Sequence, residues 1–114
     1  MKNIVAFIRP SKEDAVRQAL HEMPGVTGAT FSDVRGFGRG RGHDQSASSR
    51  DEALVGTLRK VRIDLMVPDK HADSIALGIA VAARTGNRGD GKVYILSAEK
   101  ALRISTGETG AIAV

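Results

Sequence analysis

The sequence contains no cysteine and no tryptophan, and aromatic side chains make up 4% of its 114 residues. Without cysteine, disulfide bonds and thiolate chemistry are excluded. With so few aromatic rings, the core has to be built from Val, Ile, Leu and Ala. We expect a single domain over residues 1–114, and self-association is a usual way for so small a core to gain stability.

Long apolar runs are also missing. Residues 1–10 are too short for a membrane-spanning helix and lack a small-residue cleavage site, so we expect a cytoplasmic protein without direct membrane insertion. Basic residues exceed acidic ones, 17 against 13, which gives a net charge of +4. This excess fits nucleic acid, small molecules that carry phosphate, or an acidic protein partner.

No catalytic or metal-binding constellation is recognisable. His21, His43 and His71 are scattered, with no carboxylate or cysteine at metal-ligand spacing, so three solvated side chains are the favoured interpretation. No Ser, Lys or carboxylate lies in a nucleophile motif. An enzyme that consumes a nucleotide would need a general base, and no residue stands out as one. We therefore expect a protein that is not an enzyme.

Apolar periodicity predicts four strands and two helices. Residues 2–9 have the pattern of a strand, and Ser11 is placed to cap a helix over 12–23. Further strands are expected at 26–35, 59–67 and 92–96, with a second helix that begins at Pro68-Asp69 and is capped by Gly86. The resulting order, β-α-β-β-α-β, is the α+β, ferredoxin-like arrangement. Its sheet has one face bare of helices, and self-association would cover that face.

Two glycine-rich segments interrupt this periodicity. The first is 36–43 (GFGRGRGH), which opens a stretch without apolar period up to residue 51, and the second is 85–92 (TGNRGDGK). Glycine lets the backbone approach an anion closely, and Arg and Lys bind phosphate. Each segment is thus a candidate phosphate site, although each alone is also compatible with an ordinary turn. Neither matches the Walker or the dinucleotide-binding pattern.

Several short sequence motifs follow one another along the chain. Among them are Gly-Phe-Gly-Arg at 36–39, Val-Pro-Asp at 67–69, Ala-Arg-Thr-Gly at 83–86 and Gly-Asp-Gly-Lys at 89–92. Over nearly its whole length the sequence resembles the PII nitrogen-regulatory signal proteins. The resemblance implies a homotrimer of ferredoxin-like subunits that binds ATP or ADP in three clefts between subunits. It also implies a regulator of metabolic status whose long, flexible loop, about residues 37–58, controls a membrane transporter or a metabolic enzyme.

The resemblance also implies the residues of the nucleotide site. Some would flank the phosphates at the base of the loop, some would surround them from the second turn, two would reach in from a neighbouring subunit, and two would lie near the nucleoside. In that order they are Gly36, Gly38 and Arg39; Gly89, Asp90, Gly91 and Lys92; Thr30 and Arg103; and Asp64 and Thr85. Lys60 matches the lysine that pairs with the carboxylate of the effector 2-oxoglutarate.

The sequence departs from the family pattern at several positions. Gly40 replaces a glutamine that helps to hold the magnesium ion bridging to 2-oxoglutarate, which weakens the prediction of both ligands. Ser105 replaces an arginine, and the loss of one guanidinium predicts a shift from ATP toward ADP or AMP. Glu52 and Ala53 lie where the family carries a uridylylated tyrosine, so that modification is excluded.

These departures leave alternatives open. One is a PII-like regulator of inorganic-carbon uptake that responds to ADP, AMP or bicarbonate and not to 2-oxoglutarate. Another is a nucleic-acid-binding module, against which stand the missing aromatic stacking platform and the even spread of basic residues. We therefore expect no nucleic-acid partner. Ser46, Ser48 and Ser49 are phosphorylatable residues of the loop, but serine is also its ordinary composition.

Overall fold

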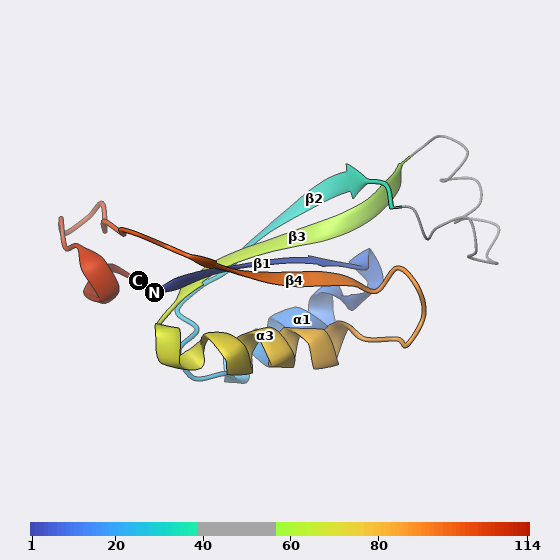
Figure 1. Cartoon of the computed structure of the whole chain (residues 1–114), viewed down its shortest axis with the longest axis horizontal. Coiled ribbons are helices and arrows are strands. Elements are labelled where there is room, and N and C mark those ends of the chain that lie inside the picture. Colours follow the sequence, from blue (N-terminus) through green and yellow to red (C-terminus); the bar gives the residue numbers. More distant parts are fainter. Residues whose placement is uncertain (39–56) are drawn as a thin grey trace.

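The computed structural model describes residues 1–38 and 57–114. Its elements follow the predicted order of strands and helices (Figure 1). They are β1 (Lys2–Ile8), the 3-10 turn η1 (Pro10–Lys12), α1 (Glu13–Glu22), β2 (Thr30–Gly36), β3 (Leu58–Val67), α3 (Asp69–Ala83), β4 (Gly91–Ser97) and the 3-10 turn η3 (Gly110–Ala113).

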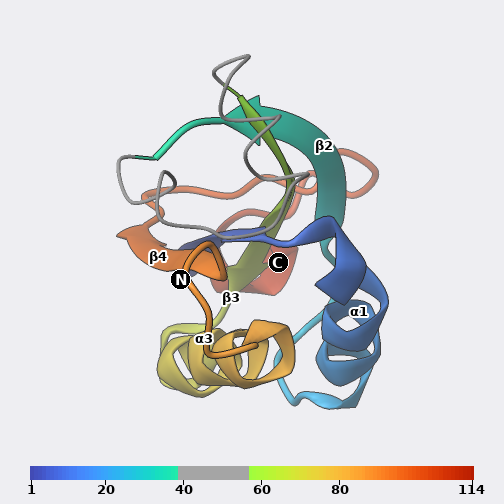
Figure 2. The ribbon, with the colours of Figure 1, turned by 90° about the vertical axis from the view of Figure 1, so that its right-hand side faces the viewer.

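The four strands form one sheet in the order β2-β3-β1-β4, and each neighbouring pair is antiparallel. Both helices lie side by side against the same face of this sheet (Figure 2). This is the α+β, ferredoxin-like arrangement expected from the sequence, and the prediction is confirmed. Among the described residues, no helix is both long enough and apolar enough to cross a membrane.

The core lies between the sheet and the two helices. In β3 every second residue, from Val61 to Val67, is buried, as the alternation of the sequence predicted. The helices contribute apolar side chains at helical spacing, Val16 and Leu20 from α1 and Ala72, Ile75, Ile79 and Ala83 from α3. The opposite face of the sheet is not covered by α1 or α3 (Figure 2), and there the Arg62 guanidinium lies 5.6 Å from the ring of Phe7.

Two predicted helix ends are wrong. Ser11 does not cap α1, because Pro10 starts a 3-10 turn that includes Ser11 and places Lys12 at the N-cap. Proline suits a first helical position, since its φ is already helical and it has no N–H to satisfy. Gly86 is not the C-cap of α3, which ends at Ala83 with Arg84 in extended conformation. Gly86, with φ of +90°, belongs to the connection that leads into β4.

The predicted start of the second strand is also wrong. Strand β2 begins at Thr30, four residues later than the alternation suggested. Val26 is the reason, because its side chain packs against the core on the helix side of the sheet. Residues 26–29 therefore connect the helix layer to the sheet. Strand β2 pairs with β3 only from Thr30 onward.

Candidate functional site

The carboxylate of Asp90 holds together the connection between α3 and β4. Its Oδ1 atom accepts hydrogen bonds from Arg9 Nε, at 3.0 Å, and from the hydroxyl of Thr85. Its Oδ2 atom accepts hydrogen bonds from the backbone N–H groups of Thr85, at 2.8 Å, and Gly86, at 2.9 Å. A carboxylate that accepts backbone N–H groups at the start of a turn fixes the backbone there in one conformation. The 85–92 segment is thus a turn whose backbone conformation is fixed by hydrogen bonds.

The same bonds set the ionisation of Asp90. Partial burial penalises the charged carboxylate and acts to raise its pKa, but the hydrogen bonds from Thr85, Arg9 and Gly86 all favour the charged form. Their combined effect is larger, so the pKa of Asp90 lies well below the ordinary range for an aspartate. Asp90 is therefore an anion throughout the range of pH in which proteins normally work.

Two basic side chains contact the turn from the sheet. Arg9, which follows the last residue of β1, also donates from its Nη2 atom to the backbone carbonyl of Arg88. Lys60, from β3, donates a hydrogen bond from its ammonium group to the carbonyl oxygen of Gly89. The 85–92 segment is therefore attached to the ends of two neighbouring strands by side chains that carry positive charge.

Glycine is required within this segment by its backbone angles. Gly86, Gly89 and Gly91 have φ of +90°, +92° and +105°, in the region that side chains disfavour. At Gly91 there is also no space, because a Cβ atom would lie 1.7 Å from the carbonyl oxygen of Phe7. Gly91 is paired with Ile8, so it brings β4 into register with β1. The two glycines of Gly-Asp-Gly therefore set the path of the chain on either side of the fixed carboxylate.

A surface pocket of about 380 Å³ adjoins the turn, between β1, α3 and β4. Its lining combines apolar residues with the exposed cations Arg84 and Lys92 and the turn itself. The lining residues are Phe7, Ile8, Ala80, Ala83, Arg84, Asp90, Gly91, Lys92 and Val93. A glycine-rich turn with basic side chains next to a partly apolar hollow is suited to binding an anionic small molecule.

The predicted site residues fall into two groups. The turn, Lys60 and the C-terminal end of β2 with Gly36 lie toward the Ile8 end of the sheet. Thr30 and Asp64, which pair in register, line a second hollow together with the C-terminal residues Lys100–Leu102 and Ala113–Val114. Gly38 is exposed just after β2, and Arg39 lies outside the described residues, as do Gly40, Glu52, Ala53 and the three loop serines.

Arg103 is far from the turn in the same chain. The C-terminal segment leaves β4 at its Ser97 end, whereas the turn enters at its Gly91 end (Figure 1). A seven-residue strand separates these ends by about 20 Å. The Arg103 guanidinium lies 3.9 Å from the carboxylate of Glu108 and 3.4 Å from the carbonyl of Ile112. One chain therefore does not bring Arg103 together with Lys92.

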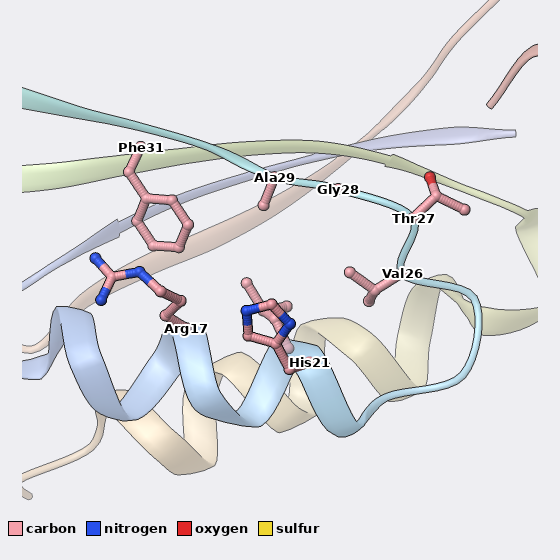
Figure 3. A pocket seen from close by; sticks show the side chains of 8 residues that line it. Arg17, His21, Val26, Thr27, Gly28, Ala29 and Phe31 are labelled. Atoms are coloured by element: carbon pink, nitrogen blue, oxygen red, sulfur yellow. The ribbon is translucent and has the colours of Figure 1, made fainter.

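A third hollow, of about 390 Å³, lies between α1 and the segment that leads into β2 (Figure 3). Arg17 lies 5.2 Å from the ring centre of Phe31, and His21 lies beside the same opening. The charge of Arg17 is already balanced by ion pairs with Asp14 and Glu13. This hollow includes none of the predicted site residues.

Sequence reasoning did not include Arg9 among the site residues. Its side chain contacts Asp90, which lies 81 positions further along the chain. The signal was present in the topology, since a β-α-β-β-α-β order places the first and last strands next to each other. A basic residue at the end of the first strand is then close to the start of the last one.

The matching family model and the similar known proteins all carry the same description. The model of the family described as nitrogen regulatory protein P-II matches residues 1–108. The nitrogen regulatory protein P-II of Rhodobacter capsulatus is 44% identical over 114 residues, which is 100% of both chains. The nitrogen regulatory protein P-II 1 of Escherichia coli K12 is 44% identical over 108 residues, or 95% of both chains.

The similarity extends to further bacteria. The nitrogen regulatory protein P-II of Rhizobium meliloti is 40% identical over 114 residues, again 100% of both chains. These names give no support to the alternative of a carbon-uptake regulator that ignores 2-oxoglutarate. The resemblance found in the sequence motifs is confirmed, and the chain belongs to the nitrogen regulatory protein P-II family, whose members are regulatory signal proteins and not enzymes.

Proposed function

We propose that this protein is a signal-transduction regulator that binds ATP or ADP and controls a partner transporter or metabolic enzyme through its long loop. The observation that carries the proposal is the 85–92 segment. Its glycines adopt positive φ, its backbone is fixed by Asp90, and its last residue, Lys92, lines an open pocket. Such a turn presents backbone and ammonium groups to phosphate oxygens without large rearrangement on binding.

The proposal includes assembly into a homotrimer with nucleotide between subunits. This assembly is supported by the separation of the predicted site residues into two groups in different parts of the sheet. A second copy that places its Thr30, Asp64 and Arg103 against the 85–92 segment of the first would complete one site. Homo-oligomers usually have closed symmetry, and a head-to-tail contact of this kind forms a ring such as a trimer when its rotation closes.

Nitrogen status is the metabolic signal that the relatives' names favour. We propose 2-oxoglutarate with magnesium as the effector to test first, and Lys60 as the residue that pairs with its carboxylate. Lys60 contacts the carbonyl of Gly89, so a ligand that engages its ammonium would act directly on the nucleotide turn. Ser105 supports the further proposal that ADP or AMP binds at least as tightly as ATP.

Calorimetric titration tests this function directly. The purified protein is titrated with ATP, ADP and AMP, each alone, with 2-oxoglutarate and magnesium, and with bicarbonate. We expect binding of at least one adenine nucleotide and tighter ATP binding when 2-oxoglutarate and magnesium are present. If no nucleotide binds under any condition, the proposed function is wrong. If nucleotide binds and only bicarbonate alters its affinity, the nucleotide site stands and the nitrogen effector is wrong.

A further inference from the structure

We propose that Arg9 and Asp90 act as positioning residues for the nucleotide turn, so that Asp90 supports phosphate binding through the backbone instead of contacting the nucleotide or its metal ion. This inference rests on the proposed function, because it concerns how the 85–92 segment acquires its affinity for phosphate. Arg9 has no role in the site implied by the family resemblance, and here it holds the turn in place. Asp90 was expected to surround the phosphates directly, and here it acts on the backbone of the turn instead.

Both carboxylate oxygens of Asp90 are already occupied by partners within the protein. Each oxygen of Asp90 already accepts two hydrogen bonds within the protein, from Arg9 and the Thr85 hydroxyl on one side and from two backbone N–H groups on the other. A carboxylate has about four lone-pair sites in all. A metal ion or a ligand hydroxyl would have to displace one of these partners.

Arg9 donates hydrogen bonds to more than one point of the turn. Its guanidinium contacts both the Asp90 carboxylate and the Arg88 carbonyl, so one planar group holds two points of the same turn. The side chains of Arg9 and Asp90 are only 25% and 23% exposed, which places this contact in the base of the turn and not on its outer surface. The pair therefore connects the turn to the end of β1.

The negative charge of Asp90 has the wrong sign for a direct contact with phosphate. A carboxylate close to bound phosphate repels it, so a turn that binds anions gains nothing from an aspartate as a charge alone. The benefit has to come from the conformation that the aspartate maintains. This gives opposite expectations for Asp90→Asn: a simple loss of repulsion tightens nucleotide binding, whereas a loss of positioning weakens it.

The experiment measures ADP affinity of the full-length protein with and without magnesium, the latter in excess EDTA. The variants are Asp90→Asn, Arg9→Gln and the two combined. Asp73→Asn, on the exposed side of α3, is the matched control for the loss of one negative charge. The wild-type protein is titrated first, because failure of wild-type binding overturns the proposed function and not this inference.

We expect each single variant to weaken ADP binding by about ten- to a hundredfold, since each removes charge-assisted hydrogen bonds that hold the turn. The loss of ADP affinity should be equal with and without magnesium. The double variant should lose no more affinity than the single variant with the larger loss, because both substitutions disrupt the same contact. Asp73→Asn should leave the affinity within about twofold of the wild type. A loss seen only with magnesium would make Asp90 a metal ligand and overturn the inference. Unchanged or tighter binding by Asp90→Asn would overturn it as well.

A second pair of variants keeps the test valid if the Asp90 variants fold poorly. Thr85→Val removes the hydroxyl that donates to Asp90 and accepts from the Asn87 N–H within the same turn, and Thr85→Ser retains it. We expect weaker ADP binding for the valine variant and recovery to within about threefold of wild type for the serine variant, with thermal unfolding of both close to wild type. Equal ADP affinity of the two variants would contradict the positioning role.

Discussion

Gly91 is the residue of the turn at which a side chain is least tolerated. It combines a φ of +105° with a carbonyl oxygen of Phe7 that occupies the place of a Cβ atom. Because that obstacle belongs to the backbone of β1, it cannot move aside as a flexible side chain would. The strict geometry at Gly91 is thus a consequence of pairing β4 with β1 immediately after the turn.

Gly91→Ala should therefore lower the free energy of unfolding by at least about 2 kcal/mol, from backbone strain and displacement of β1. Urea unfolding measures this value. Gly28→Ala is the control, since Gly28 has no positive φ and no atom within 4 Å of an added Cβ. It should change the stability by no more than about 0.5 kcal/mol. Equal stability of the two variants would contradict the geometry at Gly91.

The lowered pKa of Asp90 makes a prediction for acid solution. In the unfolded chain an aspartate titrates near pH 3.9, whereas the folded protein keeps Asp90 charged to lower pH. Its stabilisation is therefore fully present above about pH 4 and is lost as the pH falls through the lower folded value. The difference in unfolding free energy between wild type and Asp90→Asn should be constant from pH 7 to pH 5 and shrink below about pH 4. Urea unfolding at each pH checks this, and a difference that grows in acid would contradict it.

At the scale of elements, much of the fold could be predicted because burial imposes a period on the sequence. The alternation of residues 61–67 and the apolar stripe of α3 are both visible in the sequence and both lie in the core. The ends of elements were harder, since they depend on neighbours. The sequence of residues 26–29 also fits a longer strand, and only the packing of Val26 against the core delays the start of β2. The sequence around Pro10 also fits a helix capped by Ser11, although the chain forms a 3-10 turn there.

The candidate site was predictable in part for the same reason. The glycine and lysine residues of the 85–92 segment are recognisable as a motif, because their chemistry is local. The contacts of Arg9 and Lys60 with that segment are not local, and they exist only because three strands lie in a particular register. The positioning role of a side chain is thus seen only after the sheet is assembled.

The apolar stripe of α3 gives a prediction at this scale. Ile79 is fully buried between the helix and the sheet, whereas Leu77, on the same helix, is 66% exposed. Ile79→Ala should cost about 2–5 kcal/mol of unfolding free energy through lost burial and the cavity that it leaves. Leu77→Ala should cost less than about 1 kcal/mol, since its side chain is mostly in solvent already. Urea unfolding of both variants tests the assignment, and similar losses would contradict the orientation of α3.

At the scale of the whole molecule, the separation of the site residues becomes the central feature. The 85–92 segment and the C-terminal segment with Arg103 are attached to opposite ends of β4 (Figure 1). Under the proposed assembly, Lys92 of one subunit and Arg103 of its neighbour would contact the same phosphates. In that assembly nucleotide binding would depend on association, because an isolated chain would hold only part of each set of contacts.

Mixing of defective subunits tests this arrangement. Lys92→Ala and Arg103→Ala each remove one cation from the proposed site, so each variant alone should bind ADP at least about tenfold more weakly than wild type. When the two variants are unfolded together and refolded as a mixture, a subunit with an intact Lys92 can meet a neighbour with an intact Arg103. With random assembly about a quarter of the clefts regain both residues. Calorimetry should then detect a fraction of sites with wild-type affinity.

Two controls make the result decisive. Each variant refolded alone must stay weak, which excludes recovery through the treatment itself, and the mass of the assembly in solution must be that of three chains. If the mixture shows no high-affinity sites although mixed trimers form, Lys92 and Arg103 do not share a cleft between subunits. If high-affinity sites appear in the stated proportion, the two ends of the sheet meet across a subunit boundary, and the association of the chains is itself part of the nucleotide site.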